Sequence, residues 1–370
     1  MPHRVNSYVR NVSEDLDASA ALSDFRRFPR WTWRNAEVVG FVEWLRAYND
    51  ARPPGMKKAG FYGLDLYSLH ASMAAVLDYL DRVDPDAAQR ARARYACFNQ
   101  FGPDPQVYGF IAATDLDRSC RDEVVSQLVE TRRRVAGQPD SAGPISEDEL
   151  FYAEQNARLV KDAEAYYRSM FFEEVSSWNL RDTHMAETLD ALAAHLGGPD
   201  SPAKVVLWAH NSHLGDARAT DMGERGDVNV GQLVRAQYGR DAVLVGFTTH
   251  HGTVTAASDW GGPTERKRVR PALEGSWEAL FHSTSLPGRF LLDWHADETL
   301  SGALREARLE RAIGVIYRPA TERASHYFKA RLGDQFDAVL HFDETEALEP
   351  FDSGGEWQAG ELPETFPSAV

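Results

Sequence analysis

The sequence predicts an α/β fold with a largely parallel sheet covered by helices and a large helical excursion. Three observations support this class. Short apolar runs alternate with helical patterns from residue 204 onward, as in parallel sheets buried on both faces. Residues 67–200 instead carry apolar stripes at helical spacing. Apolar residues make up 43% of the 370 residues, enough for one large domain or two ordinary ones.

We assign residues 1–66 to the first α/β part. Asn35 precedes apolar residues at helical spacing and is the expected N-cap of a helix that stops before Pro53. Residues 58–66 then predict a short buried strand that ends near Asp65.

Residues 67–200 predict a helical subdomain that forms one wall of a cleft. Ser146, followed three residues later by Glu149, is a capping signal for a long helix. A further helix carries Arg181 near its start and ends at Gly197.

Residues 201–345 predict the second α/β part, and residues 346–370 an irregular tail. The expected strands are residues 204–210, 241–249, 252–258, 289–294, 314–318 and 336–342. Helices are expected between them at residues 229–239, 276–283 and 303–312. We treat the parts as one composite catalytic domain.

Net charge and cysteine content limit the partners and the cellular compartment that the sequence predicts. With 40 basic and 56 acidic residues the formal charge is −16, which opposes binding to a phosphate backbone. The one basic run, 266–270, is expected to be a local surface or a substrate contact. Neither a spanning helix nor a secretory signal is predicted. Two cysteines, Cys97 and Cys120, fit a reducing compartment, and we expect a cytoplasmic protein unless the fold pairs them.

The leading candidates for chemistry follow the first strong strand of the second part. His210, Asn211 and His213 stand where ligands bind in such sheets, at the carboxyl end of a strand. Histidine exchanges protons near neutral pH, and an amide can orient a base or stabilise an oxyanion. The structural alternative is a hydrogen-bonded loop that pins the end of the strand.

Other polar residues are weaker candidates. Asp65 also ends a predicted strand and could orient a histidine, although capping the next helix explains it equally well. Arg181 is a further candidate for the cleft. His250 is expected in a turn between two strands, where exposed imidazoles are the simpler reading. A metal site at His210 and His213 would need another ligand, such as Asp216 or His250, and the spacing of these residues is not distinctive.

Several catalytic motifs do not occur in the sequence. It contains no G-x-S-x-G, so Ser212 is not expected to be a nucleophile. It also contains no G-x-G-x-x-G and no G-x-x-x-x-G-K-[ST], which removes the dinucleotide and P-loop classes. Water activated by histidine is the simplest remaining chemistry.

Several blocks of the sequence together resemble the erythromycin esterase family, from about Arg4 to Glu344. They include "FPRWTWRNAEVVGFVEWLRAYN", "GFYGLDLYSLHAS", "SWNLRDTHMAETL" and "WAHNSHLGDARATDMGERGDVNVGQLVRAQYG". The resemblance implies an α/β fold with a helical excursion and a cleft. It also implies hydrolysis of a small-molecule ester or macrolide lactone by histidine-activated water, with no required metal or cofactor. The family's H-N-x-H motif matches His210, Asn211 and His213, and antibiotic resistance is a family association.

The chain departs from the family pattern near its start. The family carries a Gly-Glu-x-x-His-Gly block, whose histidine is the proposed base, and then a second glutamate; neither is found here. His3 lies outside that motif context. Either the start was assigned too far downstream, which the intact remainder favours, or the gene is truncated and its product impaired.

Two alternatives therefore accompany the hydrolase. One is a catalytically inactive ligand-binding remnant, which would bind saturably without forming product. The other is a metal-dependent hydrolase that uses the histidine cluster. The sequence carries no signal for oligomeric state.

Overall fold

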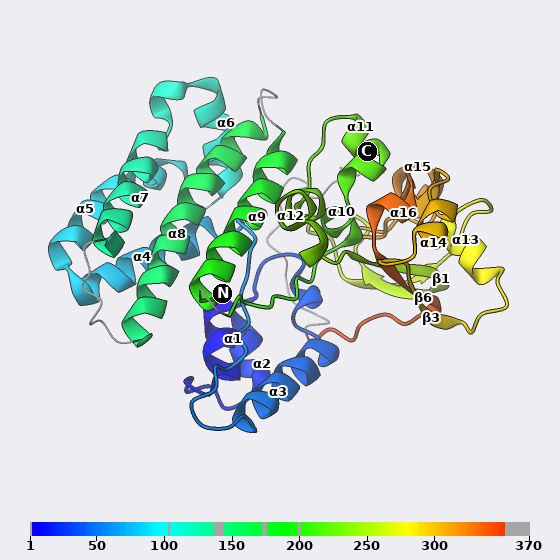
Figure 1. Cartoon of the computed structure of the whole chain (residues 1–370). Coiled ribbons are helices and arrows are strands. Elements are labelled where there is room, and N and C mark those ends of the chain that lie inside the picture. Colours follow the sequence, from blue (N-terminus) through cyan, green and yellow to red (C-terminus); the bar gives the residue numbers. More distant parts are fainter. Residues whose placement is uncertain (1, 103, 137–143, 172–175, 199–200, 352–370) are drawn as a thin grey trace. The chain divides into compact units, whose positions relative to one another are not determined.

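The computed structural model describes residues 2–102, 104–136, 144–171, 176–198 and 201–351 (Figure 1). The chain divides into two compact units, Leu64–Trp208 and the combination of Met1–Gly63 with Ala209–Val370. Helices and a small mixed sheet together confirm the α/β class. Most of the predicted tail, residues 346–370, lies outside the described residues.

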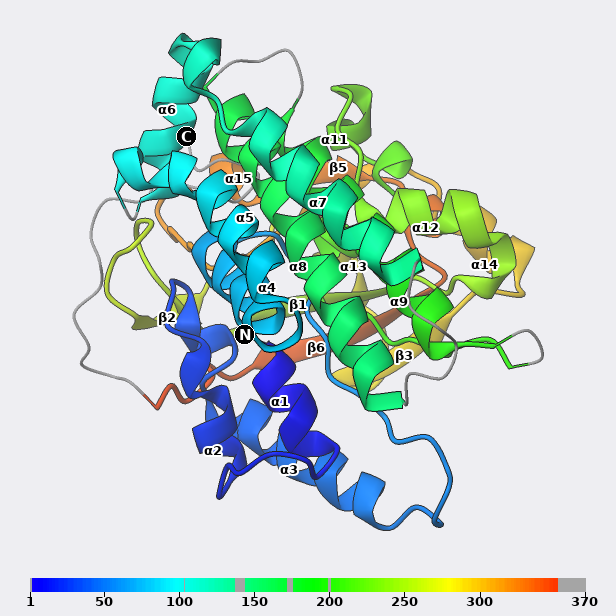
Figure 2. The same cartoon turned by 90° about the vertical axis from the view of Figure 1, so that its left-hand side faces the viewer.

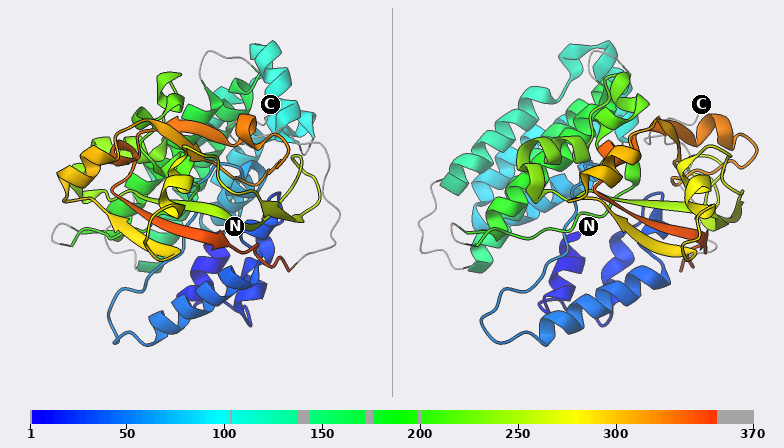
Figure 3. Two further views of the ribbon diagram at one scale, coloured as in Figure 1. Left: turned by 90° about the vertical axis from the view of Figure 1, so that its right-hand side faces the viewer. Right: turned by 45° about the vertical axis from the view of Figure 1, so that its right-hand side comes forward.

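A four-stranded sheet organises the second unit, in the order β2-β1-β6-β3 (Figure 3). Its strands are β1 (Val245–Ala256), β2 (Glu265–Val269), β3 (Arg289–Asp293) and β6 (Ala338–Thr345). Only the pairing of β1 with β6 is parallel, whereas β1–β2 and β3–β6 are antiparallel. The largely parallel sheet that the apolar runs predicted is therefore wrong, because strand direction depends on the connections and not on apolar content.

β1 is longer than predicted because Gly252 lets it continue. The sequence suggested two strands separated by a turn at His250. The structure instead runs one strand through this point, with Gly252 at a φ of +124°. A Cβ on Gly252 would lie 2.1 Å from the carbonyl oxygen of Thr345 on β6. Glycine is thus the residue that permits both this backbone angle and this approach.

A second small sheet replaces a predicted helix. Residues 303–312 were expected to be helical, but α14 (Glu298–Ala303) ends at their start and β4 (Arg308–Arg311) follows. β4 pairs antiparallel with β5 (Tyr327–Ala330). Residues 314–318 form only an isolated bridge, between Ile316 and Ala257.

Short helices complete this unit around the sheets. They are α10 (Asn211–Leu214), α11 (Asp221–Glu224), α12 (Val230–Tyr238), α13 (Trp277–His282), α15 (Glu322–Ser325) and α16 (Leu332–Gln335). The main core lies between α13 and one face of the large sheet and includes Trp277, Phe281 and Val339. On the sheet itself, Leu291 is 59% exposed and Phe247 is 41% exposed, so apolar side chains also reach the surface.

Two predicted strands do not form. Residues 58–66 have no strand partner, and asparagine side chains satisfy part of their backbone instead. Asn49 donates to the carbonyl of Ala59 and accepts from its N–H, both at 2.8 Å. Residues 204–210 are also irregular, with Val206 92% exposed, so their apolar character did not make them a buried strand.

Three helices precede residues 58–66: α1 (Pro2–Val9), α2 (Ala18–Ala21) and α3 (Ala36–Asp50) (Figure 2). They bury a shared apolar cluster that includes Val5, Leu22 and Val42. Asn35 caps α3, as predicted, by accepting a hydrogen bond of 2.8 Å from the N–H of Val38. The described residues of the first part therefore form helices joined by irregular segments, and the strand expected before Asp65 is wrong.

The unit Leu64–Trp208 is helical, as its apolar stripes predicted. It comprises α4 (Leu69–Val83), α5 (Pro85–Tyr95), α6 (Pro105–Thr114), α7 (Arg121–Ala136), α8 (Pro144–Ser169) and α9 (Ser177–Leu196). α8 contacts α4, α6, α7 and α9 and is the centre of this unit. The side chain of Ser146, the predicted cap of α8, lies outside the described residues. Across the described helices, none combines the length and apolar character needed to cross a membrane.

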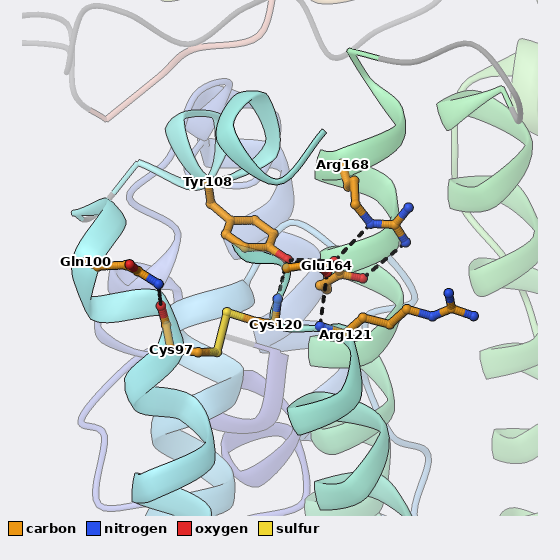
Figure 4. The surroundings of a disulfide bond; sticks show 8 residues. Cys97, Gln100, Tyr108, Cys120, Arg121, Glu164 and Arg168 are labelled. Atoms are coloured by element: carbon orange, nitrogen blue, oxygen red, sulfur yellow. Dashed lines mark hydrogen bonds and ion pairs between the residues drawn. A yellow bond between two sulfur atoms is a disulfide. The ribbon is translucent and has the colours of Figure 1, made fainter. Parts of the chain in front are cut away.

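A disulfide fastens this helical unit. Cys97 and Cys120 are bonded, with Cα atoms 5.8 Å apart (Figure 4). Beside the bond, Glu164 of α8 accepts hydrogen bonds from Tyr108 at 2.6 Å and from Ser119 at 2.9 Å. The Tyr108 hydroxyl in turn accepts from the Cys120 N–H. The cysteine count suggested a reducing compartment. Disulfides persist mainly in oxidising surroundings, so the bonded pair does not fit that expectation.

Reduction of this disulfide is expected to destabilise the protein. The bond closes a loop with a sequence separation of 23 residues, for which the chain-entropy model gives about 3 kcal/mol. The double variant Cys97→Ser, Cys120→Ser should therefore show a lower midpoint of thermal unfolding than the oxidised wild type. Reductant should lower the wild-type midpoint and leave that of the double variant unchanged. An equal midpoint for oxidised and reduced wild type would contradict the prediction.

Candidate active site

The histidine loop, defined here as residues 210–216, contains the short helix α10. His210 is the N-cap of α10, and its Nδ1 accepts from the Ser212 N–H at 3.2 Å and from the Ser212 hydroxyl at 2.9 Å. Its Nε2 lies 3.1 Å from the carbonyl oxygen of Ile313. A carbonyl can only accept, so the proton of the neutral ring is on Nε2.

His210 is therefore held as a neutral imidazole. Burial, followed by the nearby His213, lowers its pKa to about 4. Both ring nitrogens already have partners. Proton transfer by His210 would require it to release either Ser212 or Ile313, so the structure gives this residue a role in holding the loop.

Asn211 fastens the loop to the edge of β1. Its Nδ2 donates to the Phe247 carbonyl at 2.8 Å, and its Oδ1 accepts from the Phe247 N–H at 3.0 Å. One side-chain amide thus makes both hydrogen bonds that a neighbouring strand would make. The same Nδ2 also donates to Glu310 Oε1 at 3.2 Å.

His213 lies on α10 with its side chain buried. Asn229, which was not predicted to be a site residue, holds the backbone on both sides of His213. The buried Nδ2 of Asn229 donates to the carbonyls of Ser212 at 2.8 Å and Gly215 at 2.5 Å. Its Oδ1 caps α12 by accepting from the Gln232 N–H at 3.0 Å. The signal available in the sequence was an asparagine at the start of the predicted helix 229–239.

Close packing against α12 also restricts the loop. A Cβ on Gly231 would lie 2.1 Å from the carbonyl oxygen of Leu214. The N–H of Asp216 donates to the carbonyl of Gln335 at 2.9 Å. The loop is therefore joined to α12, α16, β1 and the end of β4, and this is the rigidity that a positioned catalytic group requires.

Two buried ionisable residues of β4, Glu310 and Arg311, were also not predicted to be site residues. Arg311 donates to the carbonyls of Thr249 at 3.0 Å and His250 at 2.9 Å, and its Nε lies 3.0 Å from Glu322. Glu310 is fully buried, and burial followed by the charge of Glu278 raises its pKa to about 8. Neither residue was a candidate because residues 303–312 were predicted to form a helix between two strands.

The structure groups His250 with other imidazoles. Its ring stacks on that of His282 at a centroid distance of 3.7 Å, and its Nδ1 lies 3.0 Å from Nδ1 of His251. Nδ1 of His282 lies 2.9 Å from Asp343 Oδ1. Burial and the neighbouring histidines lower the pKa of His250 to about 4. Within the described ranges, no group of three or more histidine, cysteine, aspartate or glutamate side chains is arranged to hold a metal ion.

Asp65 and Arg181 meet within the helical unit. Arg181 donates to Asp65 through Nε at 3.0 Å and through a terminal nitrogen at 2.7 Å, which is a two-pronged ion pair. The guanidinium also lies over the ring of Tyr67, 4.4 Å from its centroid. Asp65 does not cap the next helix, since the N-cap of α4 is Ser68. Asp65 therefore pairs with Arg181, and the expectation that it caps the next helix is wrong.

Comparison with solved structures supports the fold. A succinoglycan biosynthesis protein matches with a TM-score of 0.71 and 20% identity over 94% of this chain and 78% of the other. A protein from Bacillus cereus matches with a TM-score of 0.72 and 16% identity over 96% and 80%. A mutant of erythromycin esterase EreC in its open conformation matches with a TM-score of 0.53 and 16% identity over 98% and 82%.

Comparison of sequences identifies the family. Erythromycin esterase type II from Escherichia coli is 23% identical over 369 residues, which span 93% of this chain and 80% of that protein. The family model for erythromycin esterase matches residues 2–345. This match includes the histidine loop, the Asp65–Arg181 pair and both compact units. The chain belongs to the erythromycin esterase family.

Proposed function

We propose that this protein hydrolyses a small-molecule ester or lactone with water activated by a histidine of the histidine loop. Membership of the family suggests hydrolase activity. The observation that carries the assignment to a residue is the hydrogen bonding of His210. Because Ser212 and Ile313 hold both nitrogens of His210, we assign proton transfer to His213, the other histidine of the family's H-N-x-H motif.

The remaining loop residues have supporting roles in this proposal. His210 and Asn211 hold the loop, and Asn229 fixes the backbone that carries His213. A general base must lie within hydrogen-bond reach of its proton, so a fixed backbone contributes directly to the rate. In this proposal His213 transfers the proton, and His210 and Asn211 position the loop that carries it.

Asp65, Arg181 and His250 are proposed substrate-binding residues. The Arg181 fork is held by Asp65 and by the face of Tyr67, which leaves it preorganised to bind oxygen atoms of a ligand. The relative named erythromycin esterase makes macrolide lactones a reasonable class to test. Antibiotic resistance is part of the same proposal, which involves neither nucleic acid nor membrane.

Replacing His213 should abolish turnover. His213→Ala is expected to lower kcat for ester hydrolysis by about 10²–10⁴, the usual contribution of a positioned acid or base. His195→Ala is the matched control, because His195 pairs with Asp148 in the helical unit. Product formation from a panel of esters and macrolide lactones, followed by mass spectrometry, provides the measurement. Unchanged turnover in His213→Ala would refute the role, and saturable binding without product would favour a ligand-binding protein.

Removing divalent metals should leave turnover unchanged. A metal site in the histidine loop would need a ring nitrogen of His210, and both are hydrogen bonded within the protein. Hydrolysis rates before and after treatment with EDTA test this expectation. Loss of turnover in the chelator, followed by recovery with Zn²⁺, would instead support the metal-dependent alternative.

A further inference from the structure

Glu310 is an acid in an unusual position. It is fully buried on β4, and its Oε1 accepts the hydrogen bond of 3.2 Å from Asn211. Its Oε2 is buried and has no hydrogen-bond partner among the described residues. Because an unpaired buried charge costs far more than an unpaired neutral group, this environment favours the protonated carboxyl.

The groups around Glu310 do not neutralise a negative charge. From α13 it faces a second buried acid, Glu278, which accepts from the Arg311 N–H at 2.8 Å. From α16 the amide of Gln335, and from α10 that of Asn211, lower its pKa, but they carry no charge and do not offset burial and Glu278. His210, at the start of α10, has a pKa of about 4 and is neutral near pH 8.

The nearest cation is committed elsewhere. Adjacent residues of a strand point to opposite faces, so Arg311 turns away from Glu310. Its guanidinium pairs with Glu322 of α15 and donates to the carbonyls of Thr249 and His250. Ionisation of Glu310 would therefore add a negative charge beside Glu278 with which Arg311 does not pair, and this agrees with a pKa of about 8 for Glu310.

The same strand holds the histidine loop at two points. Glu310 binds Asn211, and the carbonyl of Ile313, just beyond the end of β4, accepts from His210. Asn211 in turn bridges Glu310 and the edge of β1 at Phe247. Movement of the Glu310 side chain toward water would break its hydrogen bond to Asn211, the residue two positions before His213.

We propose that Glu310 is a positioning residue, whose buried neutral carboxyl holds Asn211 and thereby fixes the histidine loop against β1. A carboxylate accepts the Asn211 hydrogen bond more strongly than a carboxyl does, but burial and Glu278 penalise the ionised form more. Deprotonation at alkaline pH therefore draws the side chain toward water, which breaks this contact and loosens the loop. Only the consequence for turnover rests on the proposed function. The structural part concerns the loop alone and can be tested without a substrate.

Histidine NMR of the wild-type protein is the first test. The ring resonances of His210 should shift with a midpoint near pH 8, although the ring itself titrates about four pH units lower. Glu310→Gln, which imitates the neutral acid, should remove this transition. Glu278→Gln removes the neighbouring acid and should move the midpoint to lower pH. A transition that is absent from the wild type, or that persists in Glu310→Gln, would overturn the proposal.

Thermal unfolding gives an independent measurement on the same proteins. The pKa of Glu310 is raised in the folded state, so its stabilising contribution is complete below the unfolded pKa and is lost as pH rises through about 8. The wild-type Tm should therefore fall by several degrees relative to that of Glu310→Gln between pH 5 and pH 9. A constant difference between the two proteins over this range would count against an ionisable Glu310.

Turnover separates this inference from the proposed function. If the protein hydrolyses an ester, kcat of the wild type should fall above pH 8, and this fall should be absent from Glu310→Gln. An identical alkaline fall in both proteins would overturn the positioning role. If neither protein hydrolyses any ester, the proposed function fails, while the NMR and unfolding results still decide whether Glu310 holds the loop.

Discussion

Asparagine side chains repeatedly form hydrogen bonds with backbone groups that no neighbouring strand reaches, and the segments around the site depend on these bonds. An amide offers one acceptor and two donors, so it can replace a neighbouring strand. Asn49 does so for Ala59, and Asn211 does so for Phe247 on the edge of β1. Asn229 satisfies carbonyls of the histidine loop in the same manner. Irregular segments can therefore be fixed without extending a sheet.

In the proposed function, this arrangement lets one short motif separate two tasks. His210 and Asn211 are fully engaged in hydrogen bonds to Ser212, Ile313 and Phe247, so they hold the loop. His213 is carried on the backbone that they fix. A histidine that must exchange protons benefits when its neighbours do not, since protonation of His210 would break a bond that holds the loop.

This construction buries ionisable groups near β4, which either form an ion pair or are neutral. Arg311 and Glu322 form a buried ion pair, and further carbonyls share the charge of the guanidinium. Glu310 and Glu278 are buried acids whose pKa values are both raised by burial. Such groups are sensitive to pH because burial penalises only their ionised form.

The sequence by itself determined the features that depend on local pattern. The helices of the unit Leu64–Trp208, the Asn35 cap and the family motif around His210 follow from neighbouring residues. Only the tertiary structure decided the direction of the strands, the continuation of β1 through His250 and the burial of Glu310 in a strand. It also decided the tautomer of His210, through the carbonyl of Ile313. These features depend on partners far away along the chain, which periodicity and capping signals cannot specify.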